Sequence, residues 1–150
     1  MEPRMKNPAA LLPGATEAVQ SLYGMIFTTG IPPATVGLVH LRASQINGCA
    51  PCVIGGTGHM RKAGETEDRI SAVAVWRDAP YFTDAERAAL DLAEAMTRLS
   101  DRPDPVPDDI WNEAAEHYDE KALAGLVLAV GMTNLFNRFN VTTRQLPGAW

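Results

Sequence analysis

The chain has 150 residues, 46% of them hydrophobic, which suits one domain with enough apolar side chains for its own core. Its net charge of −5 and isoelectric point near 5.1 argue against binding to nucleic acid or to an anionic membrane. Residues 1–14 contain no apolar leader, and the longest apolar run, residues 122–132, is too short to cross a bilayer. We therefore expect a single domain over residues 1–150 in the cytoplasm, with neither membrane nor nucleic acid as a partner.

Prolines, glycines and charged clusters separate one amphipathic segment after another, and no alternating strand pattern is present. The first segment has apolar residues at helical spacing and a possible break at Pro13–Gly14. Thr83 and Glu86 have the spacing of a capping box at the start of a later helix. Helices are expected over residues 9–29, 34–46, 50–63, 65–76, 83–99, 109–117 and 120–141. The chain is therefore predicted to be all-α.

The last of these helices is apolar nearly all round, with small residues among its leucines and valines. Such a helix is buried, either at the centre of a bundle or between subunits. Asn134, Asn137 and Arg138 interrupt the apolar pattern, and buried polar side chains need partners. We expect these three residues to hydrogen-bond between helices or subunits, and we expect a homo-oligomer.

Both cysteines of the chain, Cys49 and Cys52, lie at the expected start of the helix over residues 50–63. A separation of three residues puts their sulfurs on neighbouring positions of one helical face. The N-terminal end of a helix supplies partial positive charge and free N–H groups, which favour the reactive thiolate. Pro51 suits a first helical turn, where its missing N–H is not needed. In the cytoplasm such a pair is more often catalytic or metal-binding than a structural staple.

Further motifs surround the cysteines. The segment 41–52, LRASQINGCAPC, is followed by RKAG at 61–64, VWR at 75–77, FT at 82–83, ERAAL at 86–90 and the Asn134…Asn137-Arg138 pattern. Together these motifs resemble the alkylhydroperoxidase D-like branch of the carboxymuconolactone decarboxylase family, over residues 34–141. The resemblance implies an all-helical bundle that assembles intimately into dimers, trimers or hexamers.

The resemblance also implies a redox activity. Cys52 matches the cysteine that attacks a peroxide, and Cys49 matches the resolving cysteine that closes the disulfide. The implied partners are an organic hydroperoxide or other small substrate, and a dithiol reductant such as a lipoyl-bearing protein. No cofactor or metal is implied.

Two positions depart from the pattern of redox members, which place a glutamate twelve residues before the first cysteine and a histidine four residues after the second. These positions are Gly37 and Gly56 here, and an absent side chain cannot relay a proton. Peroxidase activity is therefore expected to be impaired or rerouted. The two glycines are also predicted to face one another and to open a pocket for a larger ligand. Gly55, Gly56 and Gly58 together are expected to weaken or distort the helix.

Each missing partner has a histidine three residues downstream, His40 after Gly37 and His59 after Gly56. One hypothesis is that His40 and His59 partly replace the lost relay. His59 lies two near-complete turns after Cys52, on the same side of the helix and about 10 Å along it, so a water or ligand would have to bridge them. The alternative is that both are half-exposed surface histidines.

Three other interpretations stay open. Cys49, Cys52, His40 and His59 have the residue types of a Cys2His2 zinc site. A second interpretation is that the two cysteines are buried, inert thiols. A third interpretation is that the protein is a repurposed or engineered non-peroxidase, which binds a small apolar ligand or cofactor in the glycine-lined pocket.

Overall fold

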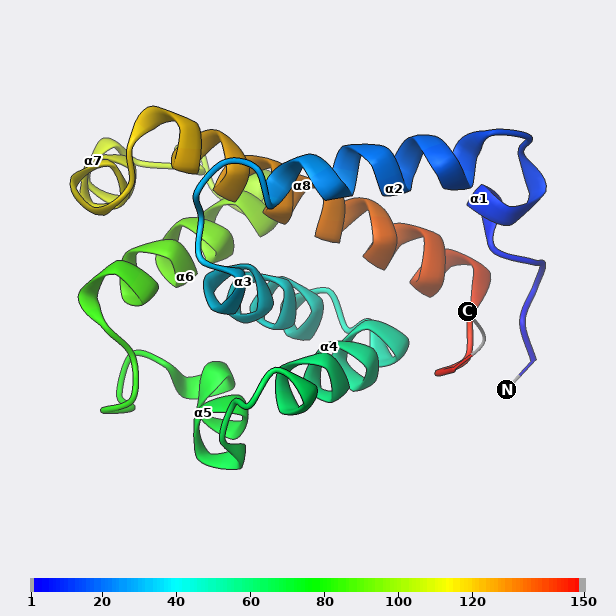
Figure 1. Ribbon diagram of the computed structural model, residues 1–150, viewed down its shortest axis with the longest axis horizontal. Coiled ribbons are helices and arrows are strands. Elements are labelled where there is room, and N and C mark those ends of the chain that lie inside the picture. Colours follow the sequence, from blue (N-terminus) through cyan, green and yellow to red (C-terminus); the bar gives the residue numbers. More distant parts are fainter. Residues whose placement is uncertain (1, 149–150) are drawn as a thin grey trace.

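The computed structural model describes residues 2–148, and in that stretch every regular element is a helix (Figure 1). The elements are α1 Pro8–Leu11, α2 Ala15–Ile26, α3 Pro33–Ile46, α4 Ala50–Lys62, α5 Glu67–Ala72, η1 Val73–Val75, α6 Asp84–Thr97, η2 Leu99–Asp101, α7 Asp108–His117 and α8 Glu120–Thr143. The all-α prediction is confirmed. The sequence also predicts an irregular tail over residues 145–150, of which residues 149–150 lie outside the described residues.

Local signals decide most helix ends. The break between α1 and α2 falls at Pro13–Gly14, where Gly14 has a φ of 80° that side chains disfavour. The capping box of α6 is present, because Thr83 Oγ1 accepts from the Glu86 N–H and Glu86 accepts from the Thr83 N–H. The single helix expected over residues 65–76 is instead shorter. Its α-helical part is α5, and the 3₁₀-helix η1 continues it.

Helix α3 is the hub of the bundle, and it packs against α4, α6 and α8 (Figure 1). Its opposite faces belong to two apolar clusters. Val36 and Val39 join the cluster formed with α2, α6, α7 and α8. Leu38 and Leu41 join the cluster formed with α4, α5, η1 and Leu90 of α6. Because apolar clusters pack against both faces of α3, the polar side chains of this helix are held between neighbouring helices.

One buried carboxylate ties α3, η1 and α6 together. Glu94 is 4% exposed and accepts hydrogen bonds from Arg42 Nε at 2.6 Å, Arg77 Nη1 at 2.7 Å and Trp76 Nε1 at 2.9 Å. Burial alone would raise the pKa of Glu94, but these three hydrogen bonds outweigh it and lower that pKa. Trp76 is itself buried and Arg77 stacks over its ring. We call Glu94, Arg42, Trp76 and Arg77 the Glu94 cluster.

Helix α8 is long and apolar enough to cross a membrane by length and composition alone. Half of its most apolar 18-residue window is buried inside the protein, which is typical of a core helix. It runs beside α2 across the molecule and also packs against α3, α4 and α6 (Figure 1). The central burial predicted from its all-round apolar pattern is confirmed on these faces.

Candidate active site at the cysteine pair

The two cysteines lie at the start of α4 and are joined by a disulfide. Cys49 is the N-cap residue and Cys52 lies in the first turn, with their Cα atoms 5.3 Å apart. Both side chains are buried, but Cys52 keeps 3% of its surface exposed and Cys49 none. The prediction that the sulfurs are adjacent at a helix N-terminus is confirmed, and the structure shows the oxidised state of the pair.

The turn before Cys49 is held by side-chain amides. Gly48 has a φ of 65°, a conformation that glycine adopts without strain. Asn47 Nδ2 donates to Asn134 Oδ1 at 3.0 Å and to Asn137 Oδ1 at 2.8 Å on α8. Asn137 Nδ2 donates in turn to Ser44 Oγ of α3 at 3.0 Å. The predicted hydrogen bonding between helices is confirmed for Asn134 and Asn137, whereas Arg138 donates to Asn134 within α8.

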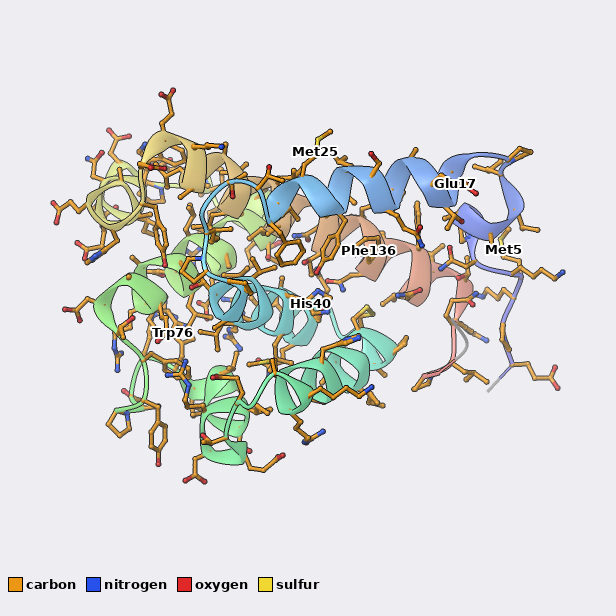
Figure 2. All side chains as sticks on the ribbon, viewed as in Figure 1. Met5, Glu17, Met25, His40, Trp76 and Phe136 are labelled. Atoms are coloured by element: carbon orange, nitrogen blue, oxygen red, sulfur yellow. A yellow bond between two sulfur atoms is a disulfide. The ribbon has the colours of Figure 1, made fainter. Side chains whose placement is uncertain are left out.

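His40 of α3 faces α4 and α8 and appears near the middle of the view in Figure 2. Its Nδ1 is 3.2 Å from Thr133 Oγ1 on α8. Burial lowers the pKa of His40, a hydrogen bond with the Cys52 backbone acts in the opposite direction, and the charge of His59 lowers it slightly further. A lowered pKa keeps the imidazole neutral at neutral pH, which is the form that accepts a proton.

The space beside the glycines is filled by neighbouring side chains, so the pocket predicted between Gly37 and Gly56 is wrong. A Cβ added to Gly56 would lie 2.9 Å from His40 Cδ2 and 3.3 Å from His40 Nε2. A Cβ added to Gly37 would lie 3.3 Å from Met60 Cγ. The imidazole of α3 thus occupies the volume that a side chain at position 56 of α4 would need. The sequence alone missed this because the two residues belong to different helices.

The expected helix distortion is also wrong, because α4 is a continuous α-helix from Ala50 to Lys62 through all three glycines. His59 lies near its C-terminal end and is exposed. About 10 Å of helix separates His59 from Cys52. The structure therefore brings His40 to the cysteine helix but leaves His59 at the surface.

Asn140 of α8 is a site residue that sequence reasoning missed. It is 1% exposed, and its Nδ2 donates to Cys52 Sγ at 3.3 Å and reaches Cys49 Sγ at 3.9 Å. Thr133, Asn137 and Asn140 recur at spacings of four and three along an otherwise apolar helix. Such a polar stripe indicates a helix face whose side chains have buried partners, and this pattern could have identified Asn140 from the sequence.

No metal site accompanies the cysteines. Within residues 2–148, no group of three or more histidine, cysteine or acidic side chains is arranged to hold a metal ion. Both sulfurs are already bonded to each other. The Cys2His2 zinc interpretation is therefore contradicted for the described residues. A cavity of about 400 Å³ lies elsewhere, near the first turns of α3, α6 and α8, and is lined by residues including Thr35, Thr83 and Tyr118.

Comparison with known proteins agrees with this geometry. Residues 13–95 match the model of the carboxymuconolactone decarboxylase family, which is more than half of the chain. The chain belongs to this family. It is 37% identical over 113 residues to the uncharacterized protein YdfG of Bacillus subtilis, covering 75% of this chain and 76% of YdfG. It is 36% identical over 110 residues to the uncharacterized protein YnjA of Escherichia coli, covering 73% of this chain and 59% of YnjA.

Solved structures show the same fold. An Agrobacterium tumefaciens protein of unknown function, whose name proposes an AhpD antioxidant defence protein, superposes with a TM-score of 0.89 and 32% identity. That match covers 97% of this chain and 98% of the other. The debrominase Bmp8 superposes with a TM-score of 0.79 at 22% identity, covering 91% of this chain and 73% of Bmp8, and shows the fold alone. The alkylhydroperoxidase D-like resemblance is thereby confirmed. The family includes enzymes, and the Cys49–Cys52 pair fits a CxxC redox role.

Proposed function

We propose that the protein is a thiol–disulfide oxidoreductase that reduces an organic hydroperoxide with Cys52 and Cys49. The disulfide at the N-terminus of α4 carries the proposal, because its two sulfurs lie at bonding distance, as a pair that exchanges two electrons requires. The Cys52 thiolate attacks the terminal peroxide oxygen and breaks the O–O bond, which gives a sulfenic acid and, after protonation, an alcohol. Cys49 then attacks the Cys52 sulfur, and water leaves as the disulfide closes.

The burial of the two sulfurs supports this division of roles. Cys52 keeps a small exposed surface, whereas Cys49 has none. The attacking sulfur must meet a substrate from outside, but the resolving sulfur needs to meet only its neighbour. A dithiol reductant, such as a lipoyl group on another protein, would restore the pair by thiol–disulfide exchange and leave as a disulfide itself.

His40 is the proposed acid–base group. Its neutral imidazole lies in the volume beside Gly56, about one helical turn after Cys52 on α4. His59 was predicted to share this role, and it would act through a bridging water from the exposed end of α4. General acid–base assistance typically contributes about 10²–10⁴-fold. We expect peroxidase turnover to fall below that of a relative with both Glu and His by about that range, and an equal rate would contradict this.

The decisive experiment is a thiol titration of the reduced protein before and after addition of an organic hydroperoxide. We expect two thiols to be lost per chain and one alcohol to form per hydroperoxide consumed. Cys52→Ser should abolish consumption. Cys49→Ser should still consume one equivalent and should stop at the sulfenic acid, which a dimedone adduct reveals by mass spectrometry. Thiols that persist in excess hydroperoxide would overturn the proposal.

The two histidines are separated by single substitutions. His40→Asn should lower the rate of thiol oxidation near neutral pH and change its pH profile. His59→Ala tests the second histidine: an unchanged rate and an unchanged thiol pKa would remove it from the mechanism. His117→Ala is the matched control, because His117 pairs with Glu113 on α7 and is remote in the fold from α4.

We also propose that the protein is a homo-oligomer located in the cytoplasm. Two apolar side chains of α2, Leu22 and Met25, are exposed, which supports an interface between subunits at this helix. Met25 lies on the outer side of α2 (Figure 2). Sedimentation equilibrium measures the assembly, and a monomer at micromolar concentration would contradict it.

A further inference from the structure

We propose that Asn140 is a catalytic residue whose side-chain amide hydrogen-bonds to the Cys52 sulfur and stabilises its anionic, attacking form. This inference rests on the proposed function and assigns a donor to its nucleophile. The amide nitrogen lies 3.3 Å from Cys52 Sγ and 3.9 Å from Cys49 Sγ, so it favours the sulfur proposed to attack. Asn140 comes from α8, more than eighty residues away from either cysteine in the chain.

The orientation of the Asn140 amide follows from its other neighbour. Asn7 is the N-cap of α1, and its Oδ1 accepts a hydrogen bond from the Ala9 N–H at 3.0 Å. The Nδ2 group of Asn7 therefore faces Asn140 and donates to Asn140 Oδ1 at 3.4 Å. With its oxygen engaged by a donor, Asn140 can present only its NH₂ group to the sulfurs. A helix cap near the N-terminus thus orients a hydrogen-bond donor at the cysteine pair.

The donor matters more to the reduced pair than to the disulfide. A neutral disulfide sulfur is a weak acceptor, whereas a thiolate carries a full negative charge and accepts a strong, charge-assisted hydrogen bond. Because Asn140 is 1% exposed, little water competes for its N–H groups. A hydrogen bond to the charged form lowers the pKa of the thiol. The amide would thereby favour the thiolate in a site that lacks the proton-relaying glutamate and histidine of other redox members.

Few titratable groups lie beside Cys52. Cys49 is bonded to Cys52, and His40 of α3 lies against Gly56, about one turn further along α4. Asn140 of α8 contacts the sulfurs and Asn7 contacts Asn140, and neither amide titrates. Replacing Cys49 by serine leaves Cys52 as the one thiol that an alkylating reagent can report on, because the chain has two cysteines.

The test measures the Cys52 pKa from the pH dependence of iodoacetamide alkylation in the Cys49→Ser protein. Asn140→Ala should raise the pKa of the Cys52 thiol by about one unit, so that the thiolate fraction near neutral pH falls about tenfold. Asn140→Asp keeps the shape of the side chain but places a carboxylate beside the sulfur, so the pKa should rise further. Thr143→Val is the control, because Thr143 is a buried polar residue of α8 whose hydroxyl donates to the Phe139 carbonyl and accepts from Gln145 Nε2.

A rate measurement separates a chemical role from a structural one. If Asn140 acts by stabilising the thiolate, the slow oxidation of Asn140→Ala by an organic hydroperoxide should recover at alkaline pH, where the thiol is ionised without help. Packing damage would persist at every pH. Alkylation needs no peroxide, so a wild-type protein that ignores hydroperoxide would overturn the proposed function while leaving the Asn140 test intact.

Folded Asn140→Ala and Asn140→Asp proteins with an unchanged Cys52 pKa would overturn the proposal. If circular dichroism shows that neither variant folds, Asn7→Ala decides, because Asn7 is only partly buried and lies outside the helical core. It should raise the Cys52 pKa by less than Asn140→Ala would, since the amide remains but is no longer oriented. An unchanged pKa in Asn7→Ala would then contradict the role of the amide.

Discussion

The two sides of α3 carry polar groups of opposite kinds. On the side towards α6, the Glu94 cluster pairs a buried carboxylate with two guanidinium groups and an indole. On the side towards α4 and α8, the neutral amide of Asn140 contacts the cysteine pair, and the neutral imidazole of His40 lies against Gly56 of the cysteine helix. The hydrogen-bonded ions of the Glu94 cluster hold helices together. Neutral donors and bases leave the sulfur free to carry the charge that the chemistry needs.

If this contrast is correct, the largest loss of stability should come from the Glu94 cluster. Glu94→Ala leaves Arg42 and the Trp76 indole without their buried acceptor, and removing one partner of such a group costs about 3–5 kcal/mol. The free energy of unfolding from urea titration measures this. Glu113→Ala is the matched control, because its carboxylate is 57% exposed, and it should change stability by less than about 0.5 kcal/mol.

The same cluster predicts a pH dependence. The pKa of Glu94 is lower in the folded chain than in the unfolded chain, so its stabilisation is present above the unfolded value of 4.5. It is lost as the pH falls through the folded pKa. Stability measured from pH 6 to pH 3 should fall less steeply in Glu94→Gln than in the wild type. Parallel curves would show that Glu94 does not contribute.

A smaller effect should appear beside the cysteines, where His40 fills the volume next to Gly56. Gly56→Ala forces the ring to move and should destabilise the fold by about 1–3 kcal/mol, despite the better helix propensity of alanine. In the His40→Ala background the same change should be neutral or stabilising. Gly58→Ala is the control, since nothing lies within 4 Å of its added Cβ, and it should stabilise by about 0.5–1 kcal/mol. If Gly56→Ala lowered the free energy of unfolding equally in the wild-type and His40→Ala proteins, the contact between His40 and position 56 would be contradicted.

The smallest effect concerns the protonation of His40. Its pKa is lower in the folded chain, so the unfolded chain binds the proton more tightly. The contribution to stability is complete above the unfolded value of 6.5 and is lost as the pH falls below it. His40→Asn should remove part of the decline between pH 7 and pH 5. NMR titration of the ring protons gives the pKa directly, and a value at or above 6.5 would contradict this prediction.

Local sequence chemistry was enough to predict most of the helices. The capping box at Thr83 and the Pro13–Gly14 break act through bonds within one or two turns, so their partners are visible in the chain. The segment after Glu65 was harder, because no local signal in the sequence marks the point where α5 ends and η1 begins, shortly before Trp76 bonds to Glu94 of another helix. Interactions between distant segments override propensity at such places.

The chain alone determined that two cysteines would meet at the start of a helix, because a spacing of three residues and a turn at Asn47–Gly48 leave their sulfurs on one face. It also determined that residues 37 and 56 would lack the expected side chains. Only the tertiary structure decided what stands there instead. His40 and Asn140 reach α4 from α3 and α8, and their positions depend on how three helices pack. The periodicity of one helix shows which face is buried, but it does not show which residue of another helix will meet that face.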